Sequence, residues 1–165
     1  MNSLVALPIL IPLVAAALML IVRGLVAQRF ISFVALLSSL ATATAVLVEV
    51  WRTSDVVVSR LGGWPGSFAI TLVSDGLSSV LVVVALVVTT SVLLFAVGQQ
   101  TSDEHSPYYH PVYMALAAGI SQAFLAGDLF NLFVAFEVLL MASYVLLTLE
   151  GNKEQIRSGT TYVVL

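Results

Sequence analysis

The stretch Gly76–Val97, GLSSVLVVVALVVTTSVLLFAV, contains no charged side chain. A helix needs about 20 apolar residues to cross a hydrocarbon core about 30 Å thick, because each residue advances it by about 1.5 Å. This stretch is long enough to do so. In the whole chain, 60% of the residues are hydrophobic and only 9% are charged, whereas soluble domains carry about 25% charged residues. The composition excludes an ordinary water-soluble fold and indicates an integral membrane protein.

Four further apolar runs accompany that stretch, at residues 4–22, 30–48, 111–126 and 129–149. With 76–97 they predict an all-α fold, a single polytopic transmembrane helix bundle over residues 1–165 with five helices. The start of a sixth helix is predicted at Thr160, five residues before the chain ends. We therefore expect the chain to be the amino-terminal fragment of a longer subunit.

The basic residues all lie outside the apolar runs, as the cost of a charge inside the bilayer requires: Arg23, Arg29, Arg52, Arg60, Lys153 and Arg157. Cytoplasmic loops carry an excess of Lys and Arg. The first loop and the tail hold four of these residues, and the opposite side holds two. The bias predicts that the amino terminus lies outside.

Several functional classes are excluded by what the sequence lacks. The net charge of −3, without a basic stripe, excludes nucleic-acid binding. The absence of cysteine excludes disulfides and thiolate metal sites. We find no glycine-rich phosphate loop, metal-ligand spacing or intramembrane serine–histidine pair. We therefore expect no enzyme, cofactor or metal centre in this chain.

Glu137 is the strongest candidate for a functional residue, because it lies near the middle of the apolar run 129–149. An ionisable group at that depth must be neutral, paired or beside water, which suits a group that binds and releases protons. At about 100° per residue, Phe130, Tyr144 and Thr148 share its side of a helix. This line is predicted to face the bundle, with Tyr144 and Thr148 leading a proton or cation path toward the next loop. The alternative is that Glu137 only fixes helix packing.

Two aspartates near helix starts have two possible roles. Asp128 precedes the fifth run, with Asn131 three residues later, and Asp75 precedes the third run. Each could belong to the transport path or cap a helix through its backbone N–H groups. Ser121 and Gln122 could face the Glu137 line, or could simply bond between helices.

The longer polar segments are predicted to be interfacial loops. Residues 49–75 contain the turn sequence Gly62-Gly63-Trp64-Pro65-Gly66, with a tryptophan suited to the headgroup region. Residues 102–110 hold both histidines, His105 and His110, beside two acidic residues. A solvated turn explains this second loop better than a cation site, because neighbouring residues in a loop do not set a coordination geometry.

The block Ala123–Tyr144, AFLAGDLFNLFVAFEVLLMASY, resembles the fourth-to-fifth helix region of the D-type subunits of the Mrp-type multisubunit sodium/proton antiporters. Gly62-Gly63-Trp64-Pro65 and the following Val73–Ser78 are similar to the same family. Its superfamily includes the proton-pumping membrane subunits of respiratory complex I. The similarity extends over essentially the whole chain.

The resemblance implies that Glu137 matches the family's essential glutamate, which works with an intramembrane lysine on a later helix. The one lysine here, Lys153, falls in a predicted loop. The implied function is that of one component of a Na+/H+ antiporter in the cell membrane, with H+, Na+ or K+, other antiporter subunits and the lipid bilayer as partners. Two alternatives are the membrane arm of an NADH:quinone oxidoreductase-like complex and a truncated assembly subunit without transport activity.

Overall fold

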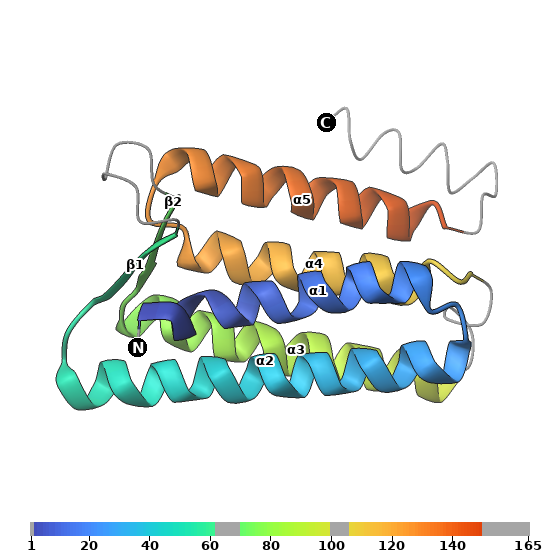
Figure 1. The fold of residues 1–165 in the computed structure, drawn as a ribbon, viewed down its shortest axis with the longest axis horizontal. Helices are drawn as coiled ribbons and strands as arrows, with labels where there is room; N and C mark the ends of the chain where they lie inside the picture. The colour runs from blue at the N-terminus through green and yellow to red at the C-terminus, as the bar shows by residue number, and fades with distance from the viewer. Residues whose placement is uncertain (1, 62–69, 100–105, 150–165) are drawn as a thin grey trace.

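The computed structural model describes residues 2–61, 70–99 and 106–149, and these form a bundle of long helices with a β-hairpin at one end (Figure 1). A short 3-10 helix, Asn2–Ala6, precedes α1. The α-helices are α1 (Leu7–Ile21), α2 (Leu25–Thr53), α3 (Gly76–Gln99), α4 (Tyr109–Leu125) and α5 (Leu129–Leu147). The predicted helical membrane bundle is confirmed. The predicted sixth helix and residues 62–66 lie outside the described residues.

Four helical segments are long and apolar enough to cross a membrane, by length and composition: Leu4–Ile21, α2, α3 and α5. The remaining helix, α4, has 17 residues and lies at the centre of the bundle. It packs against α1, α2, α3 and α5, and more than half of its side chains are buried. Its neighbours are therefore protein rather than lipid, and the chain is a multi-pass membrane protein.

The second helix is longer than its apolar run predicts. The apolar run spans residues 30–48, whereas α2 has 29 residues and a length of about 44 Å. The prediction stopped at polar residues such as Gln28 and Glu49. A helix satisfies its own backbone groups, so it continues through the headgroup region with polar side chains on its ends. It ends at Ser54, which has a left-handed φ of 52°.

A β-hairpin occupies part of the segment that we predicted to be a loop. Strands β1 (Val57–Leu61) and β2 (Ile70–Ser74) pair antiparallel, with Val57 opposite Ser74. The hairpin lies at the end of the bundle that holds the amino terminus and the α4–α5 corner (Figure 1). It therefore covers one end of the helices.

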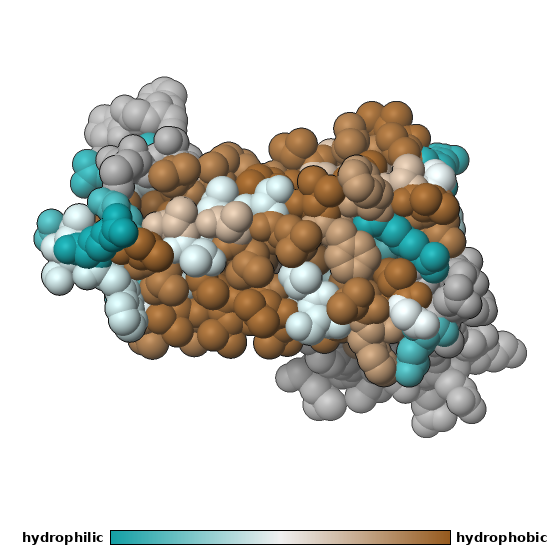
Figure 2. Space-filling model, turned by 90° about the horizontal axis from the view of Figure 1, so that it is seen from below, coloured by the Kyte–Doolittle hydropathy of each residue, from teal (hydrophilic) through white to brown (hydrophobic). Residues whose placement is uncertain are grey.

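Large apolar side chains cover the outside of the bundle. Figure 2 shows a hydrophobic band across the middle of one face, with hydrophilic residues gathered at the ends. Phe30, Leu77 and Phe95 are among the exposed large side chains. This distribution is that of helices whose outer faces contact lipid or other membrane helices.

Candidate functional site

Glu137 lies on α5, at the edge of an open groove between α1, α4 and α5. The groove has a volume of about 550 Å³. Its lining residues are Ala16, Ala17, Leu20, Pro111, Val112, Ala115, Glu137, Val138, Met141, Ala142 and Val145. Glu137 is the one polar side chain among them. The surface of the groove is almost wholly apolar, so Glu137 contributes mainly its aliphatic part to the lining.

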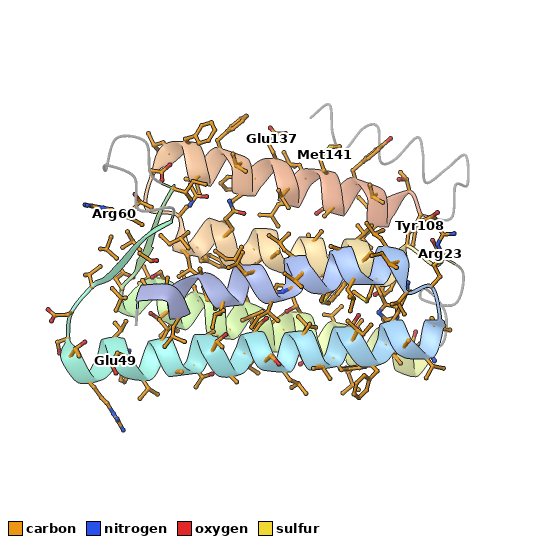
Figure 3. The ribbon with its side chains drawn as sticks, viewed as in Figure 1. Arg23, Glu49, Arg60, Tyr108, Glu137 and Met141 are labelled. Carbon is orange, nitrogen blue, oxygen red and sulfur yellow. The ribbon has the colours of Figure 1, made fainter. Side chains whose placement is uncertain are left out.

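The predicted line of Phe130, Glu137, Tyr144 and Thr148 is exposed at its first two residues and half-buried at its last two. Glu137 is exposed, and Phe130 is 72% exposed. Figure 3 shows Glu137 projecting from the side of α5 away from α4. Phe130 and Glu137 therefore lie on a side of α5 that α1 to α4 leave uncovered. The role of the line in a proton path stays a prediction.

Thr148, the last residue of that line, forms its hydrogen bond to the backbone of α5. The Oγ1 of Thr148 donates a hydrogen bond to the backbone oxygen of Tyr144 at 2.8 Å. Thr148 is also the cap residue that follows the last residue of α5. Both side chains are partly exposed, so the described helices leave room for water or a partner beside them.

The opposite side of α5 meets α4 through small residues. Ala135 and Ala142 are buried there, together with the amide side chain of Asn131. On α4, Gly119 approaches closely: an added Cβ would lie 3.2 Å from side-chain atoms of Leu139 and Val138. Small residues allow the two backbones to come together, as is common between membrane helices.

Asp128 caps α5 and also binds the hairpin. Its Oδ1 accepts a hydrogen bond from the backbone N–H of Asn131 at 2.7 Å, and its Oδ2 accepts one from the N–H of Thr71 at 3.1 Å. The backbone N–H of Gly127 donates to the oxygen of Thr71 at 2.8 Å. The two hydrogen bonds to the carboxyl group, above all the one from Asn131, lower the pKa of Asp128. The carboxylate holds the α4–α5 corner against β2.

The side chains of Gln122 and Asn131 join α4 to α5 beside this corner. The Nε2 of Gln122 donates to the Oδ1 of Asn131 at 2.7 Å, and the Nδ2 of Asn131 donates to the backbone oxygen of Thr71 at 3.3 Å. Gln122 therefore bonds to Asn131 and not to the Glu137 line. Ser121 bonds within its own helix, to the oxygen of Ala117.

Asp75 forms a reciprocal cap at the start of α3. Its Oδ1 accepts from the backbone N–H of Ser78 at 2.7 Å, while the Oγ of Ser78 accepts from the N–H of Asp75 at 2.8 Å. The N–H of Ser78 is the main cause of a lowered pKa for the Asp75 carboxyl. The carboxylate is exposed and serves the first turn of the helix.

A polar cluster that we did not predict lies at the opposite end of the bundle. His110 is fully buried in the first turn of α4, and its Nδ1 shares a hydrogen bond of 3.1 Å with the Oγ of Ser32. The prediction of a solvated loop for His110 is therefore wrong. The helix starts at Tyr109, and the Tyr109–His110–Pro111 order could have indicated this, because proline is favoured in a first helical turn.

Gln28 connects the chain segments around this cluster. Its buried Nε2 donates to the backbone oxygens of Met19 and Val22, each at 3.0 Å, and to that of Pro107 at 3.2 Å. One amide thus joins the end of α1, the start of α2 and the segment before α4. Its role is to hold the turns at this end of the bundle.

Comparison with known proteins shows similarity along the whole chain to antiporter subunits. The sequence is 42% identical to the Na(+)/H(+) antiporter D subunit of Alkalihalophilus pseudofirmus over 166 residues, which covers 100% of this chain and 34% of that protein. It is 36% identical to the protein of the same name from Bacillus subtilis, with 99% and 33% covered. The chain spans about a third of the length of these relatives, at their amino-terminal end. No family model matches.

Two solved structures share the fold. A chain in the Mrp complex from Dietzia is 31% identical, with a TM-score of 0.78, over 87% of this chain and 27% of that one. A chain of the membrane-bound sulfane sulfur reductase, an archaeal respiratory membrane complex, gives a TM-score of 0.87 at 22% identity, over 100% of this chain and 34% of that one. At that identity the second similarity shows the fold alone.

Proposed function

We propose, from the membership of this chain in the D-type family of Mrp Na+/H+ antiporter subunits, that it forms part of a proton and monovalent-cation path across the cell membrane. The path includes Glu137 and exchanges H+ for Na+ or K+. The chain acts within a complex of antiporter subunits. The names of the relatives and the Dietzia complex support this assembly.

The observation that carries the proposal is the setting of Glu137. It lies beside an apolar groove, on a helix long enough to span a membrane, and its side chain projects away from α4 (Figure 3). A lone carboxylate in lipid is costly, so ionisable residues inside membrane helices mark ion and proton pathways by default. A packing role is less well supported, because the described helices leave Glu137 exposed.

The way in which Glu137 exchanges a proton for a cation depends on the charges around α5. The arginines of the described residues lie toward the helix ends and the hairpin, where Figure 3 labels Arg23 and Arg60. A positive charge that stabilises the deprotonated carboxylate has to come from beyond α1 to α4. That charge is a transported cation or a basic group of a segment that covers the outer side of α5. Its arrival releases the proton of Glu137, and its departure allows the proton to return.

A membrane arm of a redox complex is the second candidate of a different class. It shares the fold, as the archaeal respiratory complex illustrates. The higher identities, 42% and 36%, are to proteins named as antiporter subunits. These identities favour ion exchange, and a non-transporting assembly subunit is separated from it by the experiment below.

The test is proton/sodium exchange in inverted membrane vesicles that contain the chain with its partner subunits. Glu137→Gln removes the titratable group and preserves shape. Glu49→Gln is the matched control, because it makes the same change near the end of α2. We expect exchange to disappear in the first variant and persist in the second, at equal amounts of assembled complex. If exchange persists unchanged in Glu137→Gln, the chain is an assembly subunit.

A further inference from the structure

The rotation of α5 about its own axis is determined only in part by its apolar packing. Among the described helices it packs chiefly against α4. Its fully buried side chains are Asn131, Ala135 and Ala142, while Val138 and Leu139 are half-buried and lie beside Gly119 of α4. The buried apolar residues of this face are alanines, which are too small to interlock with α4. Such contacts fix the rotation of a helix less firmly than hydrogen bonds, which require a defined geometry.

A hydrogen-bonded amide pair adds a constraint to that of the Asp128 cap, because it joins side chains of α4 and α5 directly. Asn131 is 2% exposed, and its amide accepts from Gln122 on α4 while donating to Thr71 on β2. A buried amide that loses its partners costs about 1–3 kcal/mol. The two hydrogen bonds come from different elements and different directions. Together they hold one angular setting of α5 at its first turn.

That setting determines where the carboxyl group of Glu137 lies. Asn131 and Glu137 are six residues apart, which places them about 9 Å apart along the axis and about 120° apart around it. A side chain extends about 5–6 Å from a helix axis. A rotation of about 30° would therefore move the carboxyl group by about 3 Å, whereas misplacements of about 1 Å already affect reacting groups.

We propose that Gln122 is a positioning residue for Glu137: through Asn131 it fixes the rotation of α5 and thereby the surroundings in which the carboxyl group binds its proton. This inference rests on the proposed function for its consequence in transport. The rotation of α5 itself can be measured without transport. The two parts can therefore fail separately.

The first measurement is disulfide cross-linking between α4 and α5 in the assembled complex. These 165 residues contain no cysteine, so a pair can be introduced here without background from the same residues. Ala115→Cys is combined in turn with Val138→Cys and with Met141→Cys, all at the groove. We expect Gln122→Leu to change the ratio of the two cross-linking rates at least threefold. Gln99→Leu, the same change at the exposed end of α3, should leave it unaltered.

The second measurement is the pH dependence of exchange at matched assembly, without the added cysteines. We expect Gln122→Leu to shift the pH of half-maximal exchange by about 0.5 or more, and Gln99→Leu to leave it in place. A purely structural role would lower the amount of complex but not move this pH.

An unchanged cross-linking ratio in Gln122→Leu overturns the proposal. A changed ratio with an unchanged pH profile overturns the positioning of Glu137. If the proposed function itself is wrong, the exchange assay shows it separately, because exchange then persists in Glu137→Gln.

Discussion

Asp128→Ala is expected to loosen the α4–α5 corner, because one carboxylate serves two elements there. It accepts from the backbone N–H of Asn131 at 2.7 Å and from that of Thr71 at 3.1 Å. Losing a helix cap costs about 1 kcal/mol. Losing a hydrogen bond to a charged acceptor costs about 1.5–3 kcal/mol. The two effects share one side chain, so we expect a total of about 2–4 kcal/mol.

The assay is heating of the detergent-solubilised complex, followed by the fraction of tagged chain that remains monodisperse. The midpoint should fall by several degrees, because a loss of this size is a large share of the stability of most proteins. Asp55→Ala is the matched control, because Asp55 is exposed just after α2. If the two variants melt within about 1 °C of each other, the proposed cap and its link to β2 are wrong.

The same variant has a defined pH dependence. Hydrogen bonding lowers the pKa of the Asp128 carboxyl from its ordinary value of 3.8. A lowered folded-state pKa stabilises the fold above the unfolded-state pKa, and this contribution is lost as pH falls through the folded-state pKa. The stability difference between the natural chain and Asp128→Ala should therefore be constant above about pH 5 and shrink below about pH 4. A difference that grows on acidification would contradict this.

Three further changes test the packing in the same heating assay. Gly127→Ala should destabilise the complex by about 1–3 kcal/mol, because the added Cβ would lie 2.5 Å from a side-chain atom of Val73. Gly98→Ala is the control and should be tolerated, since an added Cβ there meets nothing within 4 Å. Equal effects of the two variants would refute the close approach at Gly127. Gln28→Leu leaves three backbone oxygens without their donor and should cost about 2–3 kcal/mol, and an unchanged midpoint would show that other donors serve them. Asp75→Ala should cost about 1 kcal/mol through loss of the α3 cap, and loss of exchange with full stability would instead indicate a transport role.

Helix positions were predictable because the bilayer requires uncharged runs of a minimum length. Helix ends were less predictable, as α2 shows, because helices extend through the headgroup region on polar residues such as Gln28. The hairpin was missed although Val56-Val57-Val58 is β-branched, since a strand needs its partner across a turn. His110 was assigned to a loop because its polarity outweighed the helix-start signal from Pro111.

The candidate site was predictable only in part. A charge inside an apolar run identified Glu137, and helical periodicity identified the residues on its line. The same periodicity does not say which side of a helix meets its neighbours. Here the small residues Ala135 and Ala142 mark the contact side, and they could have indicated that Glu137 faces away from α4. The Gln122–Asn131 hydrogen bond depends on how closely two helices approach, which sequence spacing alone does not determine.

The most direct test of proton binding by Glu137 is infrared difference spectroscopy of the assembled complex during a pH change. Exchange of a proton at a carboxyl group alters its C=O absorption. We expect a protonated-carboxyl band that falls as pH rises, that shifts when Na+ is added, and that is missing in Glu137→Gln but present in Glu49→Gln. An identical band in the natural chain and in Glu137→Gln would show that Glu137 does not exchange a proton, and would contradict the central claim.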